Sequence, residues 1–214
     1  MKKIAILFDL DGTLIDSTKA IVDSFAHAFV QNSYDAPSED DVKNFVGNPL
    51  LKMFSSLGVK NADLEKVQKS YKEKYRILAP IHTHLLPNAR DAIILASKNA
   101  SLGVVTTKTS QYSHEILEHL GVRKFFKVII GFDDVQKPKP DPEPVLKALK
   151  AIGEYDEAWM IGDTHMDILA GKNAGINAYA VLGEYEAKES LQGHTKLIAN
   201  DSLEAVKAII STKR

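Results

Sequence analysis

The chain of 214 residues has no cysteine, which excludes disulfide bonds, thiolate metal sites and cysteine nucleophiles. It also lacks an excess of charge, because its formal net charge is −1, so nothing points to nucleic acid or a membrane surface as a partner. No apolar segment approaches the roughly 20 residues that a membrane-spanning helix needs. The N-terminal apolar run ends at Asp9, too early for a secretory signal. We therefore expect a cytoplasmic globular protein.

Several common catalytic motifs are missing as well. No Walker-type phosphate loop, glycine-rich dinucleotide loop or serine nucleophile elbow occurs in the sequence. His114 and His119 suggest a zinc helix at first sight, but they are five residues apart. Two histidines must be four apart to share a helix face as zinc ligands. We interpret that helix face as solvated.

The most informative stretch begins with the apolar run Ile4–Phe8, which predicts a buried strand. The strand is followed directly by Asp9-Leu10-Asp11-Gly12-Thr13. Two carboxylates two residues apart can point to the same side of an extended chain. They repel each other unless a cation or a proton intervenes. The pattern therefore indicates a metal ion, proton transfer or both, with a simple Asp-Gly turn as the alternative.

Two patterns organise the rest of the chain. Between residues 17 and 79, apolar residues recur at helical spacing and no strand is apparent. Further on, helices alternate with short apolar strands, predicted at 102–106, 128–130, 158–161, 178–181 and 197–199. This alternation predicts an α/β fold, a Rossmann-like parallel sheet with helices on both faces. We predict a core domain of residues 1–16 and 88–214 and an inserted all-helical cap domain of residues 17–87.

Polar residues follow four of the predicted strands. They are Asp9 and Asp11, then Thr106 with Lys108, then Lys137, and finally Asp163 with Asp167. The carboxyl ends of parallel strands meet at one edge of a sheet. We therefore expect one pocket that holds several carboxylates, a hydroxyl group and at least one ammonium group.

The order and spacing of these residues resemble the haloacid dehalogenase superfamily, in its phosphoglycolate-phosphatase-like branch with a helical cap. The resemblance runs from the first strand to the last helix. The matching positions are Asp9 to Leu14 for the nucleophile motif, Thr106 for the hydroxyl motif, Lys137 for the lysine motif, and Gly162-Asp163 with Asp167 for the acidic motif. Two positions depart from the branch, because Thr107 stands where relatives usually have Asn and Asn88 where they usually have Gly.

The resemblance implies roles for the acids. Asp9 would attack phosphorus and form an aspartyl-phosphate. Asp11 would protonate the leaving oxygen and then activate the water that hydrolyses the intermediate. The implied cofactor is Mg²⁺, held by the Asp9 carboxylate, the Asp11 backbone carbonyl and Asp163. Asp167 would orient Lys137 or a metal-bound water.

The remaining implied roles concern the substrate. Thr106, Thr107 and Lys137 would bind the phosphoryl group, and Lys137 would neutralise charge on the nucleophile and the phosphate. The candidate contacts to the rest of the substrate are Asn48 and Lys52 in the insertion and Lys108 beside the sheet.

The implied function is a Mg²⁺-dependent phosphatase that acts on a small phosphorylated metabolite, with 2-phosphoglycolate as the first expectation. A pyrophosphatase, a nucleotidase or a sugar-phosphate phosphatase or mutase of the same superfamily is the alternative. A receiver-like phosphoacceptor module is a remote alternative, because it needs neither the acid-base chemistry of Asp11 nor a helical insertion of this length. We expect a monomer or a homodimer.

Overall fold

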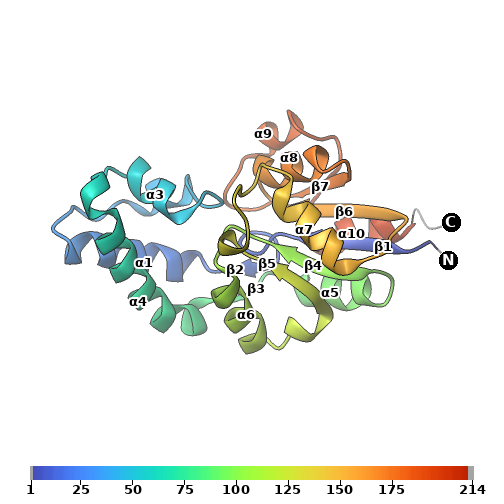
Figure 1. The fold of residues 1–214 in the computed structure, drawn as a ribbon, viewed down its shortest axis with the longest axis horizontal. Helices are drawn as coiled ribbons and strands as arrows, with labels where there is room; N and C mark the ends of the chain where they lie inside the picture. Colours follow the sequence, from blue (N-terminus) through green and yellow to red (C-terminus); the bar gives the residue numbers. More distant parts are fainter. Residues whose placement is uncertain (1, 212–214) are drawn as a thin grey trace.

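The predicted parallel sheet is present. In the computed structural model, which describes residues 2–211, six parallel strands follow the order β5-β4-β1-β6-β7-β8. They are β1 (Ile4–Phe8), β4 (Ser101–Val105), β5 (Phe126–Ile130), β6 (Glu157–Gly162), β7 (Asn177–Val181) and β8 (Ile198–Ala199). Since β1 lies between β4 and β6, the loops that follow these three strands meet at one sheet edge (Figure 1).

Helices cover both faces of this sheet, as the alternation predicts. Ile6 and Phe8 of β1 belong to one buried cluster, together with residues of α5 and α10, whereas Ala5 and Leu7 belong to another with residues of α7. Successive side chains of a strand point to opposite faces, so a strand that is apolar throughout needs cover on both sides. The helices are α5 (Ala89–Ser97), α6 (Ser110–His119), α7 (Glu143–Ile152), α8 (His165–Asn173), α9 (Lys188–Gln192) and α10 (Ser202–Ser211).

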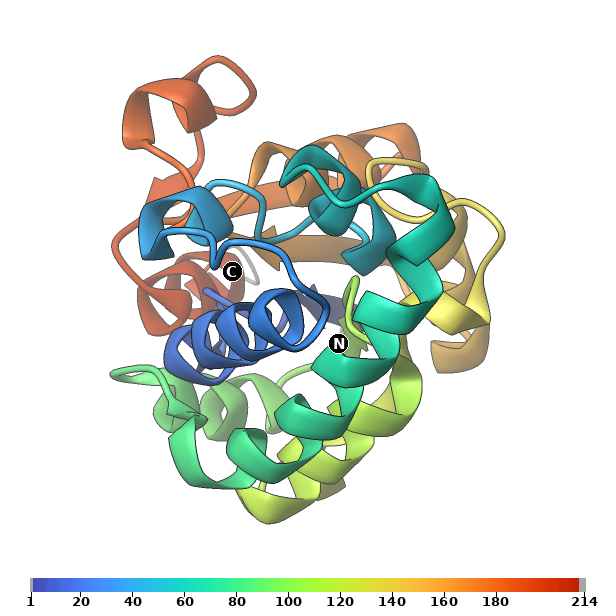
Figure 2. The same ribbon diagram turned by 90° about the vertical axis from the view of Figure 1, so that its left-hand side faces the viewer.

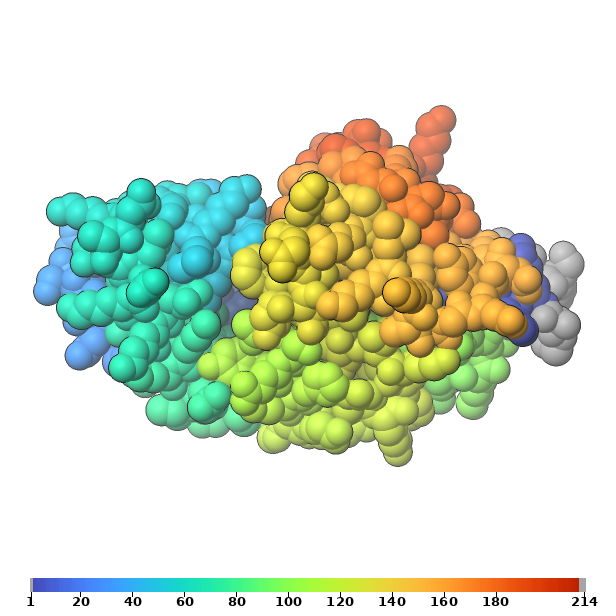
Figure 3. All heavy atoms as spheres, in the orientation of Figure 1, coloured from blue at the N-terminus to red at the C-terminus, as the bar shows by residue number. Residues whose placement is uncertain are grey.

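The insertion after β1 is helical, as predicted. Its helices are α1 (Thr18–Gln31), α2 (Glu39–Lys43), α3 (Leu50–Ser56) and α4 (Leu64–His82). α1 and α4 lie side by side (Figure 2), and the rings of Phe25, Phe54 and Tyr71 in their shared core have centroids 4.8 to 5.8 Å apart. Figure 3 shows this helical part, in blue to teal, meeting the rest of the molecule at one end.

The two connections to the helical part pair with each other, which the sequence did not indicate. β2 (Ile15–Asp16) and β3 (His84–Leu85) form a two-stranded antiparallel ribbon. The chain therefore enters and leaves the insertion at the same place. Asn88, which ends the return path, has φ +63°, so the asparagine in place of the usual glycine keeps the left-handed turn.

Local interactions explain two helix ends near the sheet edge and the insertion. α8 begins at His165, where Thr164 and Asp167 form a capping box. α4 continues past Pro80 to His82, and a proline near a helix end interrupts few hydrogen bonds. Within residues 2–211, none of the helices combines the length and the apolar character that crossing a membrane requires.

Candidate active site

Three buried carboxylates lie together at the sheet edge. Asp9 follows β1 and Asp163 follows β6, its neighbour in the sheet, while Asp167 lies in the first turn of α8. One carboxylate oxygen of each residue lies within 4.8 Å of the others. The structure thus brings together three of the four acids expected in the site.

The ammonium group of Lys139 is shared by two of these carboxylates. Lys139 Nζ lies 2.7 Å from Asp9 Oδ1 and 2.5 Å from Asp167 Oδ1, and it donates a further hydrogen bond of 3.1 Å to the carbonyl of Val105. We predicted Lys137 for this position from the sequence. The structure contradicts that prediction, because the side chain of Lys137 is exposed whereas Lys139 is buried.

The loop between β5 and α7 decides which lysine enters the site. The Glu143 carboxylate accepts hydrogen bonds of 2.9 Å from two successive backbone N–H groups, the second that of Lys137. This contact holds Lys137 at the surface. A turn closed by a hydrogen bond from the Asp141 N–H to the Pro138 carbonyl follows, and Lys139 within that turn is buried. Both lysines precede a proline, so the local sequence does not show which of them enters the site.

Replacing the buried lysine should therefore matter much more than replacing the exposed one. Lys139→Met removes the positive charge beside Asp9 and Asp167, and we expect turnover of p-nitrophenyl phosphate to fall about 100-fold, the usual cost of losing one charge-stabilising donor. Lys137→Met is the matched control and should keep turnover within about twofold. Steady-state kinetics of both variants, with circular dichroism to verify folding, make the comparison. A larger loss in Lys137→Met would contradict the reassignment.

Three carboxylates and one ammonium group leave this cluster with an excess of negative charge. Burial raises the pKa of Asp9 to about 7 despite the attraction of Lys139. Burial also raises the pKa of Asp163 well above its usual value, and repulsion by Asp9 and Asp167 adds to the effect. For Lys139, burial lowers the pKa, but attraction to Asp167 and Asp9 outweighs it and keeps the pKa above its usual value. A bound cation would offset the excess charge.

The cluster offers such a cation an unpartnered ligand atom. Among the described residues, Asp163 Oδ2 is buried without a hydrogen-bond partner, while Asp163 Oδ1 accepts a hydrogen bond of 3.0 Å from the hydroxyl of Thr13. Gly12, at φ +81°, leaves the necessary room, because a Cβ there would lie 2.2 Å from Asp163 Oδ2. Carboxylate oxygens are ligands of hard divalent cations. The residues therefore fit a divalent metal ion held by Asp163 together with Asp9.

Asp167 has both of its carboxylate oxygens engaged. Its Oδ2 accepts hydrogen bonds from the backbone N–H and the hydroxyl of Thr164, at 3.1 and 2.6 Å, and its Oδ1 accepts from Lys139. It is less suited than Asp163 to bind a cation directly. The geometry supports the orienting role expected from the sequence, with Lys139 as the oriented group.

The fourth acid, Asp11, has partners outside the cluster of Asp9, Asp163 and Asp167. The hydroxyl of Ser17 donates a hydrogen bond to Asp11 Oδ1, and Lys108 Nζ lies 3.1 Å from Asp11 Oδ2. Lys108 also donates a hydrogen bond of 2.8 Å to the hydroxyl of Tyr75. Since Tyr75 belongs to α4 and Lys108 to the loop after β4, this network joins the helical part to the sheet edge.

The two threonines predicted to bind phosphate follow β4. Thr106 is buried, and its hydroxyl oxygen accepts a hydrogen bond of 3.2 Å from the backbone N–H of Lys108. The hydroxyl group can still donate to a ligand oxygen, since a hydroxyl both donates and accepts. Thr107 lies in the wall of a cavity between the sheet edge and the helical part.

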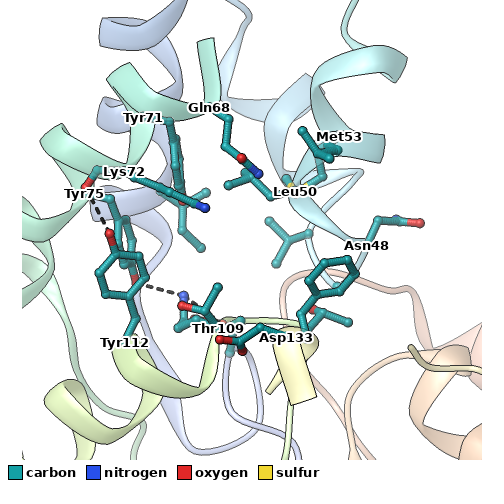
Figure 4. A pocket seen from close by; sticks show the side chains of 18 residues that line it. Asn48, Leu50, Met53, Gln68, Tyr71, Lys72, Tyr75, Thr109, Tyr112 and Asp133 are labelled. Carbon is teal, nitrogen blue, oxygen red and sulfur yellow. Dashed lines mark hydrogen bonds and ion pairs between the residues drawn. The ribbon is translucent and has the colours of Figure 1, made fainter. Parts of the chain in front are cut away.

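A cavity of about 380 Å³ lies between the sheet edge and the helical part (Figure 4). Asp11 belongs to its wall. Of the substrate contacts predicted from the sequence, Asn48 and Lys108 line it. Much of the wall comes from apolar and tyrosine side chains, among them Ile21, Val46, Leu50, Met53, Tyr71, Tyr75 and Tyr112. Polar side chains line it as well, among them Gln68 and Lys72 of α4 (Figure 4).

Lys52 does not line this cavity, contrary to the expectation from the sequence. Leu50, Leu51 and Met53 of α3 belong to the lining, whereas the side chain of Lys52 is exposed. Each helical residue is turned by about 100° from the one before it, so Lys52 lies on the side of α3 opposite to these three. The structure therefore does not place Lys52 in this cavity.

Sequence reasoning missed two further polar residues of the site. They are Ser17 and Tyr75, to which the sequence analysis assigns no role. The structure shows that they hold Asp11 and Lys108, respectively. Their signal in the sequence is weak, because Ser17 stands at the start of the predicted insertion and Tyr75 is one of two tyrosines on a helix face that is otherwise apolar.

Known proteins share this fold and this sequence pattern. A family model described as haloacid dehalogenase-like hydrolase matches residues 6–181. Pyrophosphatase PpaX of Bacillus velezensis is 34% identical over 193 residues, which cover 89% of this chain and 88% of that protein. Pyrophosphatase PpaX of Oceanobacillus iheyensis is 38% identical over 178 residues, 82% of each chain. The structure of a haloacid dehalogenase-like family hydrolase from Streptococcus pneumoniae matches with a TM-score of 0.86 and 26% identity, over 97% of this chain and 98% of that one. With its parallel sheet, its inserted helices and its acidic cluster, this chain belongs to the haloacid dehalogenase-like hydrolases.

Proposed function

We propose that this protein is a Mg²⁺-dependent phosphatase whose substrate is inorganic pyrophosphate. The observation that carries the proposal is the similarity, over more than four fifths of the chain, to two proteins named pyrophosphatases. The buried acidic cluster with its unpartnered Asp163 oxygen supports it, since it suits metal-dependent phosphoryl transfer. These relatives favour pyrophosphate over 2-phosphoglycolate, the first expectation from the sequence.

The chemistry runs through two carboxylates. Asp9 attacks one phosphorus atom, so that a bond forms between its carboxylate oxygen and phosphorus while the bond to the bridging oxygen breaks. Asp11 gives a proton to the bridging oxygen as the second phosphate leaves. Asp11 then takes a proton from the water that attacks the aspartyl-phosphate, which releases orthophosphate and restores Asp9. The burial of Asp9 keeps bulk water away from this exchange.

The surrounding residues balance charge during transfer. Lys139, already 2.7 Å from Asp9, stabilises negative charge on the phosphoryl oxygens, and the hydroxyl of Thr106 donates to one of them. Asp9, Asp163 and the backbone carbonyl of Asp11 would hold Mg²⁺, which would supply positive charge against the repulsion between the carboxylate and the phosphate. We also propose the domain boundaries given above, a cap of residues 17–87 on a core of residues 1–16 and 88–214.

Metal binding should stabilise the folded protein. Mg²⁺ at about 100 times its Kd adds about 2.7 kcal/mol to the free energy of unfolding, which corresponds to a rise in Tm of about 5–10 °C for a chain of this size. Asp163→Asn removes the unpartnered carboxylate oxygen, so the rise should disappear, and the metal-free variant should be at least as stable as the metal-free wild type because one buried repulsion is gone. Differential scanning calorimetry with and without Mg²⁺ measures both. The same Mg²⁺-dependent rise in the variant would contradict the assigned ligand.

The substrate proposal predicts rapid release of orthophosphate from pyrophosphate. We expect kcat/KM in Mg²⁺ to be highest for pyrophosphate in a panel that also contains 2-phosphoglycolate, a nucleoside monophosphate and a hexose phosphate, and to vanish in excess chelator. A colorimetric phosphate assay measures all four substrates. A higher kcat/KM for any other member of the panel would replace pyrophosphate as the substrate, and full activity in excess chelator would refute the metal requirement.

A further inference from the structure

Lys108 is a second buried ammonium group, separate from the one beside the nucleophile. Its side chain is 9% exposed and lies against Asp11, whose side chain is 13% exposed. The ammonium group lies 3.1 Å from Asp11 Oδ2 and 2.8 Å from the Tyr75 hydroxyl, 4.6 Å from the centroid of that ring. Two charged or polar partners, one from each part of the molecule, therefore fix its position. The reaction steps proposed above do not involve this ammonium group.

The location of Lys108 indicates which part of a substrate it can reach. The transferred phosphoryl group belongs at Asp9 and Lys139, where the metal ligands also lie. Asp11 faces the bond that breaks, since it protonates the departing oxygen. A cation paired with Asp11 that also lines the cavity therefore lies beside the departing group and not beside the transferred one.

We propose that Lys108 binds a negatively charged departing group, and so makes the enzyme selective for substrates that carry an anion next to the bond that breaks. The inference rests on the proposed phosphoryl transfer from substrate to Asp9. The second phosphate of pyrophosphate has this property, and so does the carboxylate of 2-phosphoglycolate. An ester with a neutral departing group would leave the ammonium group without a substrate partner.

The rest of the cavity supports this assignment. Apart from Lys108, the lining contains one other ammonium group, that of Lys72, which extends into the cavity from α4 (Figure 4). The remaining polar residues of the lining are uncharged, such as Thr107 and Thr109, or acidic, such as Asp133, so they do not balance the charge of a buried anion. An anionic group near Asp11 is therefore matched by Lys108, which is held in place before the substrate arrives.

A matched pair of substrates tests the proposal directly. 2-Phosphoglycolate and 2-hydroxyethyl phosphate both have alkoxide departing groups and differ in carrying a carboxylate or a neutral CH₂OH. We expect wild-type kcat/KM to favour 2-phosphoglycolate by about 10-fold or more, and Lys108→Met to reduce that ratio by about 10- to 100-fold, the effect of losing a charge-assisted hydrogen bond. Pyrophosphate should lose at least as much kcat/KM in this variant as 2-phosphoglycolate. Both esters depend on Asp11 in the same way. A change in the acid-base function of Asp11 would therefore lower both kcat/KM values equally and leave their ratio unchanged.

Two further variants complete the test. Lys52→Met, on the exposed side of α3, should leave the ratio unchanged. Tyr75→Phe keeps the buried ring but removes the hydroxyl that positions Lys108. It should reduce the ratio by about 2- to 10-fold. If Lys108→Met does not fold, this variant tests the role of Lys108 in its place. An equal ratio for the wild type and Lys108→Met, a wild type that does not discriminate, or a collapse of the ratio in Lys72→Met instead, would overturn the proposal.

These outcomes are distinguishable from failure of the proposed function. If pyrophosphate is not hydrolysed but the 2-phosphoglycolate ratio still depends on Lys108, the role of Lys108 stands and the pyrophosphatase proposal falls. If pyrophosphate is hydrolysed equally well by the wild type and Lys108→Met, the enzyme is a pyrophosphatase and Lys108 does not select its substrate.

Discussion

Asp9→Asn is expected to reduce pyrophosphate turnover by about 10⁴-fold or more, because an amide cannot replace the carboxylate that attacks phosphorus. The substitution keeps the size of the side chain. Burial raises the pKa of Asp9 to about 7, so the fold tolerates a neutral group at this position and the loss should not reflect unfolding. Rapid-quench kinetics with radiolabelled pyrophosphate measure turnover and phosphoenzyme together, and the variant should form no phosphoenzyme.

The matched control for this experiment is Asp35→Asn, which makes the same chemical change in the exposed loop between α1 and α2. It should keep turnover within about twofold of the wild type. Phosphoenzyme that still forms at the wild-type rate in Asp9→Asn would place the nucleophile on another residue.

Asp11→Asn should separate the two halves of the reaction. The amide can hold its hydrogen-bond partners, but it cannot give a proton to a departing oxygen or take one from water, so we expect a loss of about 10²- to 10⁴-fold with the alkoxide of 2-phosphoglycolate. p-Nitrophenyl phosphate has a departing group that needs little protonation, so its first step should suffer less. Breakdown of the Asp9 phosphoenzyme then becomes limiting, and the intermediate should accumulate.

Rapid quenching of Asp11→Asn during turnover of the aryl ester is the measurement, with the wild type as the reference. Equal losses for the two substrates, without trapped phosphoenzyme, would mean that Asp11 is not the acid and base. The ion pair with Lys108 makes the folding control necessary here, because Asp11 contributes to the contact between the sheet edge and α4.

The parts of the fold that the sequence predicts are those set by local pattern. The apolar run Ile4–Phe8 ends where the acids begin, and it forms the central strand of the sheet. Asp163 follows a second apolar run that becomes its neighbour. The rule that parallel strands end at one edge then suffices to bring these acids together, without knowledge of any side-chain contact.

The errors concern choices that depend on contacts between distant residues. Lys137 and Lys139 have the same local context, and only the hydrogen bonds of Glu143 and the fold of the loop distinguish them. Whether the Lys52 side chain faces the cavity depends on how the short helix α3 is rotated about its axis. The few apolar residues of this helix do not define that rotation. The pairing of β2 with β3 cannot be predicted from the sequence pattern, because each strand has only two residues.

The position of β1 in the sheet also has a consequence for protein synthesis. Asp9 precedes Lys139 in the chain by 130 positions, and Thr13 precedes Asp163 by 150. β1 pairs directly with β6, so the strand that leads into Asp9 lacks one neighbour until β6 has been synthesised. Contacts between segments so distant in sequence form late in folding. A nascent or prematurely terminated chain that ends before β6 therefore contains Asp9 and Asp11 without Asp163 and Asp167, so the buried acidic cluster can form only after β6 and α8 have been made.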